Sequence, residues 1–225
     1  PHVTWDGLYT KTTVTELKKA AYTEEEGSKE LYEAHSEEAY VPGFMREDDI
    51  SVEGTRRGSA YHRIMELMDF TIALKEGNIE EDIRKIRENA VASHRIADTE
   101  DALVRNDKVE AFMKTDLARR MGLAEWRNCL HKEQPFMLGI GADKVKPDFP
   151  EEEIVLIQGV IDAYFEEEDG LVLMDYKTDR VDTGEELVSR YSVQLMYYAE
   201  ALERLTHKKV KEKLIYSFAL HEVIK

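Results

Sequence analysis

Cysteine is almost absent from this sequence, whose 225 residues contain only Cys129. One thiol cannot build a disulfide framework, a thiolate zinc site or a four-cysteine iron–sulfur cluster, so we expect none of these. Long apolar runs are also lacking, which argues against a membrane-spanning helix. The first residues have neither the basic region nor the apolar region of a signal peptide. We therefore expect a cytoplasmic protein with no membrane partner.

Positive charge is scarce as well: 31 Lys and Arg residues face 47 Asp and Glu residues, which gives a net charge of −16. This balance argues against a protein that holds nucleic acid by net charge alone. Much of the acidity lies in residues 23–55, around Pro42 and Gly43. We interpret this acidic strip as a solvated connector, and a docking segment for a partner is the alternative.

The length and the hydrophobic share of 42% are typical of one folded core with appendages. Residues 10–22 predict a short helix, which with the acidic strip forms a lead-in over residues 1–57. Residues 58–127 have helical spacing, with Gly77 and Gly122 as expected helix stops. Residues 128–225 predict an α/β core, with strands at 130–138, 154–165, 171–177 and 214–220 and a helix at 184–206.

The segment GVIDAYFEEEDGLVLMDYKTD, residues 159–179, predicts a β-hairpin. A four-residue loop would place Asp162 opposite Asp175, whereas a two-residue loop at Asp169-Gly170 would place it opposite Lys177. Since Asp175 and Lys177 are two residues apart, either register gathers all three charged side chains on one face, within roughly 5 to 8 Å.

Carboxylates that face each other repel unless a cation lies between them, and oxygen ligands suit Mg²⁺ or Mn²⁺. Lys177 could steady a water molecule or offset the charge of a phosphate. A surface ion pair on a solvent-facing hairpin explains the same spacing equally well. The hairpin alone therefore leaves a metal site and a surface ion pair open.

Two further pairs of polar residues are spaced four apart on expected helices, which puts each pair on one helix face. His62 and Glu66 form the first pair, and Gln194 and Tyr198 form the second. No HExxH zinc signature is present. Taken singly, each pair is better explained by packing or solvent exposure than by a site.

Considered together and in order, five segments resemble the RecB-type family of PD-(D/E)xK nucleases. Within that family they are most similar to the AddA-type nuclease domains of bacterial helicase–nucleases. The resemblance extends from residues 12–20 to residues 216–220. The segments that carry it are GSAYH (58–62), QPF (134–136), GVIDAYF (159–165), DYKTD (175–179) and QLMYYAEAL (194–202).

The resemblance implies an α/β fold with a restriction-endonuclease-like core, in which helices flank a mixed β-sheet. It implies a metal-dependent deoxyribonuclease of exonuclease type that uses Mg²⁺ or Mn²⁺ and acts in DNA repair and recombination. The implied metal ligands are His62, Asp162 and Asp175. The implied catalytic residues are Asp162, Asp175, Lys177, Gln194 and Tyr198, with Glu133 and Glu66 as additional candidates.

The implied partners are a single-stranded DNA end, helicase segments of the same longer chain and a second, AddB-like polypeptide. The sequence has no G-x-x-x-x-G-K-[ST] loop, so we expect any ATPase activity to reside outside these residues. Arg56, Arg57 and Arg63 are close in sequence to the candidate histidine and offer local positive charge. Two alternatives stay open: a non-catalytic docking or DNA-guiding module with a nuclease fold, and a stand-alone repair exonuclease.

Overall fold

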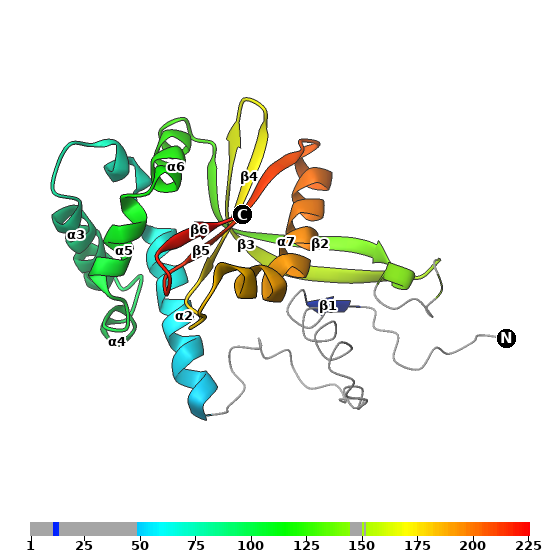
Figure 1. Cartoon of the computed structure of the whole chain (residues 1–225), viewed down its shortest axis with the longest axis horizontal. Coiled ribbons are helices and arrows are strands. Elements are labelled where there is room, and N and C mark those ends of the chain that lie inside the picture. The colour runs from blue at the N-terminus through cyan, green and yellow to red at the C-terminus, as the bar shows by residue number, and fades with distance from the viewer. Residues whose placement is uncertain (1–10, 14–48, 145–149, 151) are drawn as a thin grey trace.

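The computed structural model describes residues 11–13, 49–144, 150 and 152–225, with the backbone alone for residues 49–53. Of the described residues, 49–126 are mainly helical, and 130–225 form a mixed sheet with one long helix (Figure 1). The helical part contains α2 (Asp49–Leu67), η2 (Phe70–Leu74), α3 (Ile79–Ala92), α4 (Asp98–Asp101), α5 (Asn106–Met113) and α6 (Asp116–Trp126). The remaining elements are β1 (Lys11–Thr13), β2 (Leu130–Gly141), η3 (Ala142–Lys144), β3 (Ile154–Glu167), β4 (Gly170–Lys177), α7 (Gly184–Thr206), β5 (Val210–Ser217) and β6 (Glu222–Ile224).

The strands form one sheet in the order β1-β3-β4-β5-β6, and β2 pairs with the other edge of β3. β2, β3 and β4 pair antiparallel in sequence, whereas β4 and β5 are parallel. Parallel neighbours need a crossover connection, and α7 supplies it. The sheet is therefore mixed, as the family resemblance implies.

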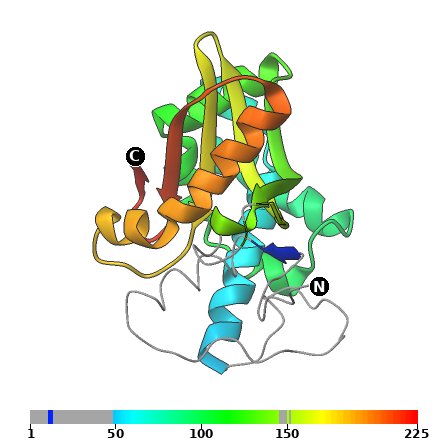
Figure 2. The same ribbon diagram turned by 90° about the vertical axis from the view of Figure 1, so that its right-hand side faces the viewer.

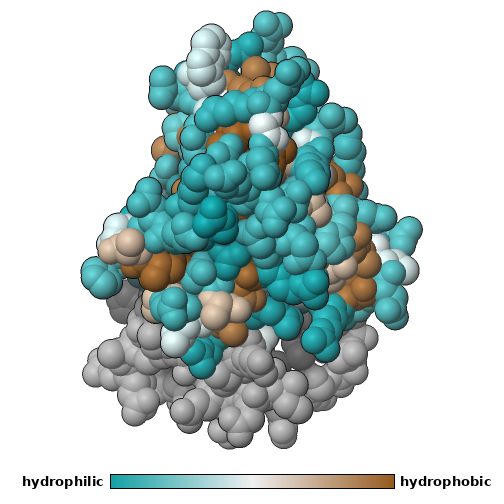
Figure 3. Space-filling view, turned by 90° about the vertical axis from the view of Figure 1, so that its left-hand side faces the viewer, coloured by the Kyte–Doolittle hydropathy of each residue, from teal (hydrophilic) through white to brown (hydrophobic). Residues whose placement is uncertain are grey.

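Helices cover both faces of the sheet (Figures 1 and 2). On one face, Val172, Met174 and Tyr176 of β4 pack against the layer formed by η2 and helices α2 to α6. On the other face, Leu171 and Leu173 of the same strand pack beneath α7. Side chains alternate along a strand, so Asp175 and Lys177 belong to the α7 face. The outer surface of the helical layer is largely hydrophilic (Figure 3).

The β3–β4 hairpin has the register that the sequence predicts for a four-residue loop. Glu166 pairs with Leu171, and Glu167 pairs with Gly170, so the loop itself is only Glu168 and Asp169. Gly170 adopts a φ of 147°, and a Cβ atom there would lie 2.7 Å from the backbone oxygen of Lys209. The turn thus requires glycine, and it fixes which residues of β4 face Asp162.

The structure confirms the predicted helix at 184–206, which is α7. Thr183 caps its first turn by accepting a hydrogen bond from the Glu186 amide, at 3.4 Å. Glu185 and Glu186 add negative charge where the helix dipole is positive. His207 ends the helix in the left-handed conformation, with a φ of 58°.

The predicted helix at 10–22 is wrong for its described part, because Lys11–Thr13 is a strand that pairs parallel with Leu156–Gln158 of β3. β-Branched threonines suit a strand, and the edge of β3 offers hydrogen-bond partners that a sequence pattern does not reveal. Residues 14–22 of that helix, and residues 23–48 of the acidic strip, lie outside the described residues.

Two glycines behave differently from the prediction. α2 begins at Asp49 and runs through Gly58, so it crosses the expected boundary between residues 57 and 58. Gly122 lies inside α6 rather than at its end. A Cβ atom on Gly122 would lie 2.5 Å from the Phe70 carbonyl oxygen, so this glycine allows α6 to approach η2 closely.

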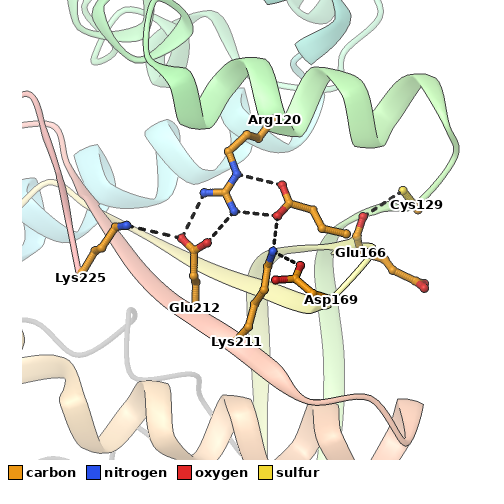
Figure 4. Close-up of polar contacts among 8 residues, drawn as sticks. Arg120, Cys129, Glu166, Asp169, Lys211, Glu212 and Lys225 are labelled. Atoms are coloured by element: carbon orange, nitrogen blue, oxygen red, sulfur yellow. Dashed lines mark hydrogen bonds and ion pairs between the residues drawn. The ribbon is translucent and has the colours of Figure 1, made fainter.

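An ion-pair network connects α6 to the sheet near the hairpin loop (Figure 4). Arg120 Nε lies 2.9 Å from Glu167 Oε1, and Arg120 Nη2 lies 2.8 Å from Glu212 Oε1 of β5. Lys211 Nζ lies 2.6 Å from Glu167 Oε2 and also pairs with Asp169. One guanidinium therefore joins the helical layer to two strands.

Candidate active site

The candidate site lies where β3 and β4 separate. Backbone pairing between the two strands runs from the hairpin loop only as far as Ala163 and Met174. At the next residue, a side-chain hydrogen bond replaces the backbone pairing, because Asp162 Oδ2 accepts a 2.7 Å hydrogen bond from the Tyr176 amide. This bond holds a buried carboxylate at the point of separation, with α7 on one face of the sheet and α2 on the other (Figure 2).

Three side chains at this point form a group of metal-ligating type. His62 Nδ1 lies 3.2 Å from Asp162 Oδ1 and 3.9 Å from Glu133 Oε1. One ligand atom from each of the three lies within 4.8 Å of the others. A pocket of about 440 Å³ opens beside the group, and its walls include Gly58, Ser59, His62, Arg63, Glu66 and Glu133.

A second group surrounds Asp175, which is fully buried. Lys177 Nζ lies 2.6 Å from Asp175 Oδ2. From α7, Gln194 Nε2 lies 3.1 Å from Asp175 Oδ1, to which it donates a hydrogen bond, and 2.8 Å from Tyr198 Oη. The sheet and α7 thus hold the carboxylate in one orientation.

Lys177 has a further neighbour outside the set of residues that the sequence predicts. Its ammonium lies 4.1 Å from the centre of the Tyr191 ring, and the Tyr191 hydroxyl donates a 2.9 Å hydrogen bond to Asp179. A signal is present in the sequence, since Tyr191 precedes Gln194 by three residues and Tyr198 by seven, which puts all three on one face of α7.

The charges of the two groups act on one another. Burial disfavours the charged form of His62, but the charge and hydrogen bond of Asp162 more than offset this and raise the pKa of His62 to about 9. Burial would raise the pKa of Asp162, but His62 and Lys177 lower it below the usual value. Burial raises the pKa of Asp175 to about 6 against the charge of Lys177. Burial, followed by the charge of Asp162, raises the pKa of Glu133 to about 7.

A family comparison fits this geometry. The model of the PD-(D/E)XK nuclease superfamily matches residues 34–223 of the chain. The chain belongs to this superfamily. The expected fold and the resemblance to RecB-type nucleases are therefore confirmed.

Curated relatives of this nuclease-superfamily chain are named as the A subunits of ATP-dependent helicase/nucleases, in line with the AddA-type resemblance. The protein from Lachnoclostridium phytofermentans is 34% identical over 223 residues, which cover 84% of this chain and 16% of the relative. The protein from Clostridium botulinum strain Loch Maree is 35% identical over 221 residues, which cover 96% of this chain and 16% of the relative. The chain thus spans about one sixth of the length of these relatives.

The structure brings most of the expected residues together, but it distributes them over the two groups. The three implied metal ligands, His62, Asp162 and Asp175, are divided between them, and Glu133 joins His62 and Asp162. Glu66 lines the pocket and pairs with Arg63.

Among the helices that the structure describes, none is both long enough and apolar enough to span a membrane.

Packing explains why the motif residues occur with this spacing. The Phe136 ring meets the Tyr198 ring edge-on, with 5.5 Å between their centres. A Cβ atom on Gly159 would lie 2.8 Å from the Phe136 ring and 3.4 Å from the Tyr198 ring. The glycine of GVID therefore leaves room for the phenylalanine of QPF, which in turn packs against the tyrosine that contacts Gln194.

Proposed function

We propose that the chain is the metal-dependent DNA exonuclease domain of an ATP-dependent helicase–nuclease. In this proposal it hydrolyses phosphodiester bonds of DNA during double-strand break repair and recombination. The main support is the close approach of His62, Glu133 and Asp162 at the strand separation, next to the Asp175–Lys177 pair. Membership of a nuclease superfamily gives this arrangement its chemical context.

The donor set fits a divalent cation of the Mg²⁺ or Mn²⁺ type. Carboxylate oxygens suit both ions, and His62 adds one imidazole nitrogen to the donor set. We assign His62, Asp162 and Asp175 as ligands, as the family resemblance implies, and Glu133 as a fourth donor from its position. When bound, such an ion would polarise the phosphate and acidify a water molecule. His62 must lose its proton to become a ligand.

The residues of the chain would supply the rest of the chemistry. The Lys177 ammonium would orient the attacking water and offset the negative charge that grows on the phosphate in the transition state. Gln194 holds Asp175 through its side-chain amide and is itself held near Tyr198. The Tyr191 ring restrains the lysine. Orientation of this kind lowers the entropic part of the barrier.

The proposal that this domain belongs to a helicase–nuclease rests on the names of its relatives. Their name combines a helicase with a nuclease, and this chain corresponds to about one sixth of them. We propose that helicase segments of the same longer polypeptide, together with an AddB-like partner, deliver a single-stranded DNA end to this domain. Tethering to a motor would supply a high effective concentration of DNA, which a chain of net charge −16 would not reach by attraction alone.

The test is digestion of end-labelled single-stranded DNA by the chain in Mg²⁺, in Mn²⁺ and in EDTA. We expect cleavage only with a divalent ion, and a loss of about 100-fold or more in Asp162→Asn. Asp169→Asn is the matched control, because it makes the same chemical change at a side chain that is 74% exposed in the hairpin loop.

Cleavage in EDTA, or equal activity of Asp162→Asn and Asp169→Asn, would contradict the proposal. Calorimetric titration of the folded wild-type chain with Mn²⁺ completes the test. A folded chain that neither binds Mn²⁺ nor cleaves DNA would instead be a docking or DNA-guiding module.

A further inference from the structure

A group of basic residues lies beside the candidate site, near the contact between α2 and the start of α5. Arg57 of α2, Lys108 of α5 and Arg180, which follows β4, come from three separate elements. Burial and the charges of Arg105, Arg57 and Arg180 lower the pKa of Lys108, so these cations lie within electrostatic reach of one another. We call Arg57, Lys108 and Arg180 the basic cluster.

Specific contacts bring these elements together. The Arg105 amide at the start of α5 donates a 3.1 Å hydrogen bond to the Tyr61 hydroxyl of α2. The Tyr61 ring packs against the Phe218 ring just after β5, with 4.5 Å between their centres. Lys108 Nζ donates a 2.6 Å hydrogen bond to the Phe218 carbonyl oxygen. The cluster therefore stands on a well-packed junction of α2, α5 and the end of β5.

The cluster is continuous with the candidate site. A Cβ atom on Gly58 would lie 3.4 Å from Thr178 Oγ1, so α2 and the end of β4 touch at this point. Gly58 also lines the pocket beside His62. Arg57 precedes Gly58 by one residue, and Arg180 follows Thr178 by two. The two arginines thus lie within two residues of a contact that borders the pocket.

Within the part of the chain that the structure describes, these cations lack paired counter-charge, although the charge of Asp107 acts on Lys108. Throughout the described ranges, Arg57, Lys108 and Arg180 form no ion pair, although acidic residues outnumber basic ones in the chain. The nearby Asp107 is engaged by Arg105, at 2.7 Å, and Asp179 accepts its bond from Tyr191. Cations that gather without a protein partner repel one another unless an anion lies between them.

We propose that Arg57, Lys108 and Arg180 bind the phosphodiester backbone of a single DNA strand next to the scissile phosphate. This inference rests on the proposed nuclease function and adds the path of the substrate to it. Successive phosphates would lie against the guanidinium groups and the ammonium, while the bases would make no sequence-specific contacts with the cluster. A local cluster of this kind reconciles DNA binding with a strongly acidic chain.

The test measures binding of a fluorescent single-stranded oligonucleotide by anisotropy in EDTA, where the proposed reaction does not proceed. The variant combines Arg57→Gln, Lys108→Gln and Arg180→Gln. We expect its dissociation constant to rise about tenfold or more at roughly 50 mM salt. The slope of log affinity against log salt should fall by about 2, since each phosphate contact on a single strand contributes about 0.7.

The matched control combines Arg119→Gln, Lys209→Gln and Lys213→Gln, which removes the same charge from three exposed residues without ion pairs in the described structure. Lys209 lies at the opposite end of β5 from Phe218, roughly 30 Å away at about 3.3 Å per residue. The control should bind within about twofold of wild type, because it leaves the cluster intact. A second variant, Arg57→Gln with Arg180→Gln, keeps the Lys108 contact to Phe218 and guards against misfolding.

Equal weakening by the variant and the control would overturn the proposal, as would tighter binding of an RNA strand of the same length. A single-phosphodiester substrate, thymidine 5′-monophosphate p-nitrophenyl ester, separates this inference from the proposed function. We expect the triple variant to hydrolyse it with Mn²⁺ within about twofold of wild type, because the ester does not extend to the cluster. A wild-type chain that binds DNA through the cluster but hydrolyses neither substrate would contradict the nuclease proposal alone.

Discussion

At the scale of single residues, Lys177 combines burial with two contacts. Its ammonium pairs with Asp175 and lies over the Tyr191 ring, and the whole side chain is only 11% exposed. Burial disfavours the charged form, but the charges of Asp175 and Asp162 more than compensate and raise the pKa of Lys177. The lysine therefore stays protonated at neutral pH, which favours a role in charge stabilisation over a role as general base.

The ring of Tyr191 should act as a positioning group for this lysine. We expect Tyr191→Leu to lower kcat about tenfold with little change in KM, because a buried cation–π contact contributes about 1 to 2 kcal/mol. Tyr191→Phe keeps the ring and loses the bond to Asp179, so kcat should stay within about threefold of wild type. Steady-state cleavage of single-stranded DNA measures both. Equal losses in the two variants would assign the effect to the Asp179 bond instead of the ring.

The sequence predicts most of the residues that meet at the site, because a tight hairpin fixes how Asp162, Asp175 and Lys177 face each other. It indicates Glu133 less firmly for a physical reason. Twelve residues, 142–153, separate β2 from β3, so the sequence offers no short hairpin from which to derive the register that brings Glu133 close to Asp162. Glu133 also has a φ of 48°, a local conformation that spacing does not predict.

At the scale of elements, the long helix and the hairpin are predictable from their own residues, whereas contacts between distant elements are not. α7 has a cap, an acidic first turn and a left-handed end, which are all local signals. β1 depends on the edge of β3, and the position of Gly122 depends on η2. Both departures from the prediction arise where a partner far away in sequence determines the local structure.

Gly122 gives a test of this point, because two glycines in helices have opposite surroundings. Gly54 in α2 has no described atom within 4 Å of an added Cβ atom, so Gly54→Ala should raise the free energy of unfolding by about 0.5 to 1 kcal/mol. Gly122→Ala places its methyl group against the Phe70 carbonyl and should lower that free energy by about 1 to 3 kcal/mol. Urea unfolding followed by circular dichroism compares them. A stabilised Gly122→Ala would show that α6 does not need to approach η2 so closely.

At the scale of the whole molecule, positive charge is concentrated at particular contacts although the net charge is negative. The chain carries a net charge of −16, yet cations lie at contacts between separate elements of the described structure. Lys177 lies between β4 and α7, the basic cluster lies between α2 and α5, and Arg120 lies between α6 and the hairpin. We infer that positive charge serves local tasks in this fold: reaction chemistry, phosphate binding and the joining of layers.

The Arg120 network should therefore make stability depend on pH in a defined direction. Hydrogen bonds from Arg120, and then from Lys211, lower the pKa of Glu167 from 4.5 to about 2 against the effect of burial. Because the folded-state pKa is the lower one, this stabilisation is fully present above pH 4.5 and is lost as the pH falls toward 2. At pH 7, Glu167→Gln should lower the free energy of unfolding by about 1 to 2 kcal/mol.

The neighbouring residue provides the control for this prediction. Glu166 pairs with Lys208, and both side chains are nearly half exposed, so Glu166→Gln should cost less than about 1 kcal/mol. Urea unfolding between pH 7 and pH 3 should show the difference between wild type and Glu167→Gln shrinking as the pH falls, because acid protonates the wild-type carboxyl group. A difference that stays constant over this range would mean that Glu167 acts through packing, and that its charge does not join the two layers.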